Sequence, residues 1–134
     1  MVVARTNMEF TLLVLLALFS VKHFLADFVF QSQHMIETKG IYGASGGLHH
    51  AFVHGMLTAF VLLPIIPQVI IVLQLAFVDA FLHYHIDWAK MKIGRKYNYT
   101  PSDRAFWFWI GLDQLLHYLT YIGITAWVFL IITL

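Results

Sequence analysis

Residues 69–90 read VIIVLQLAFVDAFLHYHIDWAK, and this stretch decides the fold. Its first ten residues are apolar except for one glutamine, and the run is as long as the roughly 20 helical residues that cross a bilayer. Asp79, His83 and Asp87 follow at intervals of four, which places them on one face of a helix. Because ionisable side chains are costly in lipid, the stretch predicts a membrane helix that turns this face toward partner helices.

Three further apolar stretches are long enough to span a membrane, at about residues 9–31, 48–66 and 106–134. Continuous apolar runs without alternation favour helices over a barrel. We therefore predict an all-α fold, a polytopic membrane protein built as a four-transmembrane-helix bundle, with residues 1–134 forming a single transmembrane domain. The first stretch contains Lys22, His23 and Asp27 and lacks a small-residue cleavage site, so we do not interpret it as a signal peptide.

The composition agrees with a membrane location and excludes several classes of protein. Of 134 residues, 60% are hydrophobic and 11% charged, whereas soluble domains are about 45–50% apolar and about 25% charged. A net charge of +1 provides no basic field for binding nucleic acid. The absence of cysteine from the sequence excludes disulfides, thiolate metal sites, iron–sulfur clusters and a cysteine nucleophile.

The connections between the stretches predict the topology. A glycine-rich loop with a short interfacial piece is expected at residues 34–47, a tight proline hairpin at 64–67, and a polar loop at 91–104 in which Ser102 or Asp103 caps the last helix. Cations concentrate in or beside the first and third connections: Lys39, Lys90, Lys92, Arg95, Lys96 and Arg104. The positive-inside rule then predicts a multi-pass protein of the bacterial inner (plasma) membrane with both termini on the non-cytoplasmic side. The cations near residues 90–96 are interpreted as topology signals, with an anionic lipid head group as an alternative ligand.

Histidine is unusually frequent, with eight residues against seven of Asp and Glu together. Every apolar stretch has ionisable residues four apart, and these residues are His23 and Asp27; His50 and His54; Asp79, His83 and Asp87; and Asp113 and His117. At about 1.5 Å rise per residue, all four sets lie in the cytoplasmic half of the bundle. The sequence therefore predicts one shared polar pocket at that depth, because side chains of facing helices converge in a bundle core.

Closely packed carboxylates and imidazoles need a cation or protons to neutralise them. The mixed nitrogen and oxygen donors suit a divalent metal such as Zn, Mn or Fe, with Ni also compatible. The predicted metal ligands are His23, His50, His54, Asp79, His83, Asp87 and His117. Asp27 and Asp113 are predicted to be catalytic, as a general base or to orient a ligand. His34 and His49 are expected at the membrane interface, and His85 on another face of its helix.

Four motifs resemble those of a known family: KHFLADFVFQ (22–31), HHAFVHG (49–55), DAFLHYHIDWAK (79–90) and DQLLH (113–117). The chain resembles a small family of four-helix membrane proteins of bacteria and phages, known by a domain-of-unknown-function label. This resemblance implies the fold and no activity. A weaker similarity, in the four-residue spacing of His and Asp, is to inner-membrane proteins described as metal-dependent hydrolases.

Three functions fit these observations. The first is a metal-dependent hydrolase acting on a lipid or lipid-linked substrate at the cytoplasmic side, because a metal activates water without a serine or cysteine nucleophile. The second is a di-iron membrane oxidase, suggested by His49-His50-x-x-x-His54. The third is a non-enzymatic protein that binds protons or ions, as a homo-oligomer or as an accessory subunit of a larger membrane complex. Whether the chain is an enzyme stays open, and membrane lipid is the expected partner.

Overall fold

The structure, a computed structural model, describes the backbone of residues 2–133 and the side chains of residues 8–133. These residues form helices and no strand, which confirms the all-α prediction. The elements are α1 (Val2–Phe24), the π-helix η1 (Leu25–Val29), α2 (Gln33–Thr38), α3 (Ser45–Leu62), α4 (Val69–Tyr97) and α5 (Arg104–Thr133).

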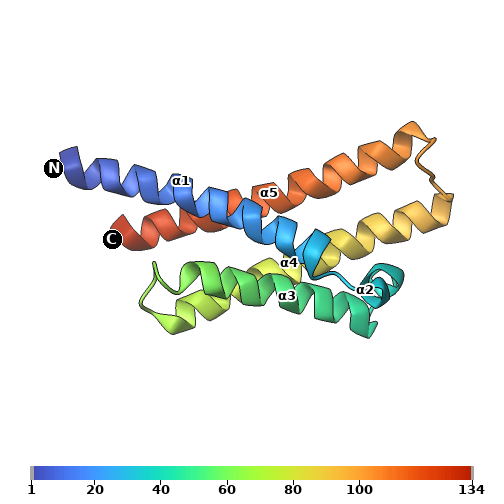
Figure 1. The fold of residues 1–134 in the computed structure, drawn as a ribbon, viewed down its shortest axis with the longest axis horizontal. Coiled ribbons are helices and arrows are strands. Elements are labelled where there is room, and N and C mark those ends of the chain that lie inside the picture. Colours follow the sequence, from blue (N-terminus) through green and yellow to red (C-terminus); the bar gives the residue numbers. More distant parts are fainter. Residues whose placement is uncertain (1, 134) are drawn as a thin grey trace.

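The four longer helices run roughly along one axis (Figure 1). Both ends of the described chain and the α3–α4 turn lie at one end of the molecule, whereas α2 and the α4–α5 turn lie at the other. Three segments are long and apolar enough to cross a membrane, namely Met8–Val29, Val69–Tyr97 and Arg104–Thr133. The protein therefore has the composition and helix lengths of a membrane protein.

Two predicted boundaries differ from the structure. The first span does not continue as one α-helix to residue 31, because it passes into η1 after Phe24. The polar connection predicted at 91–104 is helical up to Tyr97, so the loop itself covers only residues 98–103. Helical geometry does not require apolar side chains, and α4 ends only at Asn98, whose left-handed backbone (φ 51°) stops it.

The residue before α5 has a different role from a simple helix cap. The Oδ2 atom of Asp103 accepts hydrogen bonds from the backbone nitrogen and the hydroxyl of Thr100, at 2.7 and 2.9 Å. These hydrogen bonds lower the pKa of the exposed Asp103 carboxyl below its ordinary value. Asp103 thus tightens the α4–α5 turn. The predicted interfacial piece of the first loop is α2, where the Ser32 hydroxyl accepts from the backbone nitrogen of Met35.

The buried core has an apolar half and a polar half. Apolar packing occupies the end nearest the termini and the α3–α4 turn, and its members are Leu15, Phe19, Leu62, Ile66, Val72, Leu75, Tyr121, Ile124 and Val128. Among the glycines, Gly55 brings α3 close to α4, since an added Cβ would lie 3.1 Å from the Ala76 carbonyl oxygen and from Ala80 Cβ. The polar half begins one to two helical turns further along each helix.

Candidate metal centre

A single π-turn positions Asp27 at the end of α1. The backbone nitrogen of Phe30 bonds to the carbonyl of Leu25 at 2.9 Å, the i to i+5 pattern of η1. Such turns interrupt α-helices and are frequent at functional sites. Here the Oδ1 atom of Asp27 lies 2.9 Å from His54 Nε2 and 3.2 Å from His50 Nε2, both on α3. The π-turn therefore delivers the carboxylate to the histidines of a different helix.

His83 of α4 completes this group. Its Nε2 atom lies 3.2 Å from His50 Nε2 and 3.9 Å from Asp27 Oδ1. The His54 and His83 rings stack with centroids 3.4 Å apart. All three imidazoles are buried. Four potential ligand atoms from α3, α4 and η1 thus lie within 4.8 Å of one another, and we call Asp27, His50, His54 and His83 the four-ligand group.

A second group of three potential ligands shares His83. It contains His83, Asp87 and His117, again with all ligand atoms within 4.8 Å. Asp87 Oδ2 lies 3.6 Å from His83 Nε2, and Asp87 Oδ1 lies 3.7 Å from His117 Nε2. The two groups are therefore adjacent parts of one chamber: they share His83, and His50 Nε2 of the first group lies 3.2 Å from Asp87 Oδ2 of the second.

Three lysines neutralise the other aspartates of this chamber. Lys22 Nζ lies 2.5 Å from Asp79, Lys39 Nζ 2.9 Å from Asp87, and Lys90 Nζ 3.4 Å from Asp113. Lys22 and Lys39 are buried, and Lys90 is partly exposed.

Asp27 differs from these three aspartates. Its ion pairs within the described side chains are all with imidazoles, at 2.9–3.9 Å. Lys22 adds a longer-range attraction to Asp27, and the direct balance of the Asp27 charge comes from protons on histidine or from a bound cation.

The distances in the four-ligand group fit a small cation. Four nitrogen or oxygen ligands at 2.0–2.1 Å from a tetrahedral metal are about 3.3–3.4 Å apart. Four of the six separations among Asp27, His50, His54 and His83 are 2.9, 3.2, 3.2 and 3.9 Å, which lie on both sides of that value, and the other two are at most 4.8 Å. The donors also suit zinc, manganese or iron. The donor types and these four separations are compatible with a bound divalent ion.

Some predicted site residues belong to the two ligand groups, and others only lie beside them. Asp79, predicted as a ligand, is in neither group, because its Oδ2 accepts from Lys22 and, at 2.6 Å, from the Thr58 hydroxyl. His23 has both ring nitrogens engaged, Nδ1 at 2.8 Å from the Tyr121 hydroxyl and Nε2 at 3.1 Å from Gln114 Oε1. Neither residue is needed to complete the groups.

The two predicted catalytic residues also have different positions. Asp27 is a member of the four-ligand group. Asp113 lies outside both groups, with Oδ1 at 3.4 Å from His117 Nε2 and Oδ2 at 3.4 Å from Lys90. Of the other histidines, His34 contacts the Ser45 hydroxyl at 3.0 Å, and His85 Nδ1 lies 2.8 Å from the Phe81 carbonyl oxygen.

Several partners of the chamber were not predicted as site residues. The sequence indicates Lys39 and Lys90 only as topology signals and indicates no role for Gln114. Thr58 and Tyr121, however, lie one turn beyond His54 and His117, so extending the four-residue spacing by one step would have found both.

The protein is therefore all-helical, with three helical segments long enough to cross a membrane and a buried cluster of histidines and aspartates. The chain belongs to a family of proteins of unknown function, DUF3307, whose model matches residues 14–133 and therefore includes the whole cluster. No curated protein and no solved structure matches the chain.

Proposed function

We propose that α3 is a fourth membrane span. Its 18 residues rise about 27 Å, close to the roughly 30 Å of the hydrocarbon core. Its exposed face is an apolar stripe with a four-residue spacing, formed by Leu48, Phe52, Met56 and Phe60. His50 and His54 on the same helix are buried. This pattern supports a four-helix bundle in a bacterial inner membrane, and the cations beside the α4–α5 turn favour termini on the non-cytoplasmic side.

We propose further that the four-ligand group binds one divalent metal ion. The observation that carries this proposal is the environment of Asp27, a carboxylate that lies on a π-turn and among four imidazoles, those of His23 and of the three histidines of the four-ligand group. In the described structure it forms no ion pair with a lysine. In this assignment Asp27 acts as a ligand and not as the general base. Zinc, manganese and iron all accept this donor set.

The chemistry that we propose is hydrolysis of a lipid ester at the cytoplasmic side. A bound divalent ion supplies a water of lowered pKa and polarises the ester oxygen. His117 lies between two carboxylates, 3.4 Å from Asp113 and 3.7 Å from Asp87, and its buried Nε2 has no hydrogen-bond partner in the described part of the chain. We assign His117 the transfer of the proton to the leaving group, and Asp113 the orientation of its ring.

Elemental analysis of the detergent-purified protein tests the metal assignment. We expect about one divalent ion per chain in the wild type and none in His54→Ala/His83→Ala. The matched control is His49→Ala/His85→Ala, which removes two histidines outside the ligand groups and should retain the ion. Equal metal in both double variants, or no binding by a folded wild type supplied with zinc, manganese and iron in turn, would contradict the proposal.

The chamber also has features of a proton-sharing network without metal. Lys22 Nζ lies 3.4 Å from His54 Nδ1, a geometry in which Nδ1 accepts and Nε2 donates its proton to Asp27. With three lysines against four aspartates, one protonated histidine would balance the charge. This second candidate predicts a wild type that binds no metal under any of the loading conditions above.

A further inference from the structure

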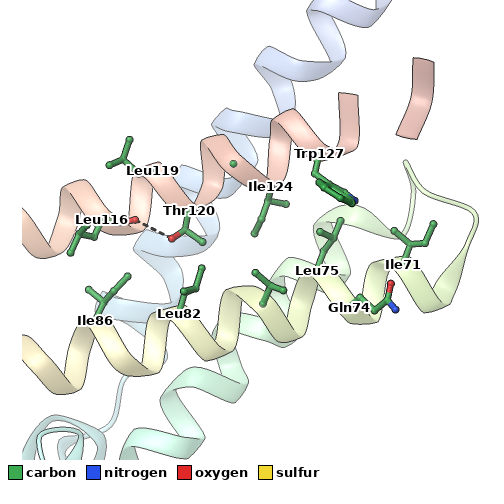
Figure 2. A pocket seen from close by; sticks show the side chains of 12 residues that line it. Ile71, Gln74, Leu75, Leu82, Ile86, Leu116, Leu119, Thr120, Ile124 and Trp127 are labelled. Carbon is green, nitrogen blue, oxygen red and sulfur yellow. Dashed lines mark hydrogen bonds between the residues drawn. The ribbon is translucent and has the colours of Figure 1, made fainter. Parts of the chain in front are cut away.

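A long groove separates the outward-facing sides of α4 and α5 (Figure 2). Its volume is about 730 Å³, within the range of small-molecule sites. On α4 its lining side chains recur every three or four residues from Ile71 to Ile86, a rise of about 22 Å. Across the gap α5 contributes Leu116, Ile124 and Trp127. Polar lining is confined to Gln74 and Thr120, and the Thr120 hydroxyl already donates to the Leu116 carbonyl.

A second cavity of about 550 Å³ continues this seam toward the α4–α5 turn. Its lining includes Tyr99, Trp109 and two cations. Lys90 also pairs with Asp113, and the Arg95 guanidinium, which has five N–H donors, also donates to the Glu37 carbonyl oxygen. Lys90 lies one helical turn beyond Ile86 and therefore on the same face of α4. The seam between the two helices is thus apolar over the part that lies in the membrane and cationic where it reaches the interface.

We propose that the groove and the cationic cavity together bind one anionic phospholipid, with an acyl chain in the groove and the phosphate against Lys90 and Arg95. The hydrocarbon of one leaflet is about 15 Å deep, so the groove is long enough for such a chain. Charge complementarity favours a lipid over a second copy of this protein, because a two-fold contact on this seam would bring the same cations together.

Two successive ion pairs link the lining of the cationic cavity to the chamber of the proposed metal centre. Lys90 Nζ lies 3.4 Å from Asp113, which lies 3.4 Å from His117. A phosphate held by Lys90 would therefore be near Asp113, to which we assign the orientation of His117, the residue that transfers the proton. This placement indicates an anionic glycerophospholipid as the substrate class. That assignment rests on the proposed function, whereas binding of the lipid to the groove and cavity does not. Hydrolysis of one ester uses one water: its hydroxyl joins the acyl or phosphoryl centre and its proton goes to the leaving alkoxide.

Two glycines of α5 provide a matched pair of variants for the groove. An added Cβ meets no atom within 4 Å at either Gly111 or Gly123, so both positions accept a side chain. Gly123 lines the groove, whereas Gly111 lines neither cavity. Native mass spectrometry would measure binding of palmitoyl-oleoyl phosphatidylglycerol. We expect Gly123→Leu to reduce binding at least tenfold and Gly111→Leu to bind as the wild type does.

The head-group assignment is tested with a second pair on α4. Arg95→Gln should reduce the preference for phosphatidylglycerol over phosphatidylcholine roughly tenfold, since one charge-assisted contact is removed. Lys92→Gln, which removes a cation outside the cavity lining, should leave that preference unchanged.

The outcomes separate the lipid site from the metal centre when metal is measured in the same samples. Lipid lost and metal retained in Gly123→Leu supports the phospholipid site, and so does phosphatidylglycerol binding by a wild type that holds no metal, which rejects only the proposed function. Undiminished lipid binding by Gly123→Leu overturns the site. A wild-type dimer that Gly123→Leu converts to monomer also overturns it, in favour of a second copy of the chain.

Discussion

Lys22 on α1 and Asp79 on α4 form an enclosed ion pair, and we predict that Lys22→Met destabilises the protein by about 3–5 kcal/mol. The two charged atoms are 2.5 Å apart, and the side chains are 3% and 1% exposed. Without the lysine, the Asp79 carboxylate would keep the Thr58 hydroxyl at 2.6 Å as its hydrogen-bond donor. One neutral donor does not compensate a buried negative charge, which is the origin of the expected cost.

The double variant Lys22→Met/Asp79→Asn removes both charges and should unfold within about 1 kcal/mol of the wild type. Unfolding in mixed micelles with increasing dodecyl sulfate, followed by circular dichroism, gives the free energies for a double-mutant cycle. Asp79 is in neither ligand group, so Asp79→Asn should retain bound metal. If the changes in unfolding free energy of the two single variants add up to that of the double variant, the ion-pair reasoning is refuted. Metal loss in Asp79→Asn alone would show that Asp79 is a metal ligand.

Three further predictions concern packing, the α4–α5 turn and the metal. Gly55→Ala should destabilise the protein by about 1–3 kcal/mol through the close α3–α4 contact, whereas Gly111→Ala should stabilise it by up to about 1 kcal/mol. The same unfolding assay measures both variants. Equal changes in unfolding free energy would contradict the tight packing at Gly55. The pKa of Asp103, measured by NMR, should lie below the ordinary aspartate value and rise in Thr100→Ala. Because the pKa is lowered in the folded protein, the stabilisation from Asp103 is present at neutral pH and lost as the pH falls through that pKa. An unchanged Asp103 titration in the variant would contradict the role of the Thr100 hydroxyl. Removing the metal with a chelator should lower the free energy of unfolding, by about 2.7 kcal/mol relative to protein at a metal concentration 100 times the Kd, and no change would argue against binding to the folded state.

The main outline of the fold followed from local periodicity. A spacing of four places two side chains on one helical face wherever the helix sits, and for this reason the sequence indicates which ionisable residues of each helix share a face. It does not indicate which of them join a ligand group: His23, Asp79 and Asp113 lie outside both groups. The apolar pattern predicts the end of α4 at Lys90, where polar residues begin, and that boundary is wrong. The helix itself continues until Asn98 changes its backbone conformation.

The finer geometry of the chamber depends on contacts between distant residues. Asp27 reaches His50 and His54 only through the π-turn, which no composition rule indicates. Asp79 shares a helical face with His83, yet it lies about 6 Å further along the axis, where Lys22 of α1 is its partner. Which carboxylate pairs with a lysine, and which is left for imidazoles, is therefore decided by the relative depths of the helices.

X-ray absorption at the metal K-edge of the purified, metal-loaded protein tests the central claim most directly. We predict a first coordination shell of nitrogen and oxygen at about 2.0–2.1 Å for zinc, with the outer scattering of about three imidazoles, and loss of that scattering in His54→Ala/His83→Ala. A spectrum with oxygen ligands alone, or an imidazole signal that survives the double variant, would contradict the four-ligand group of Asp27, His50, His54 and His83.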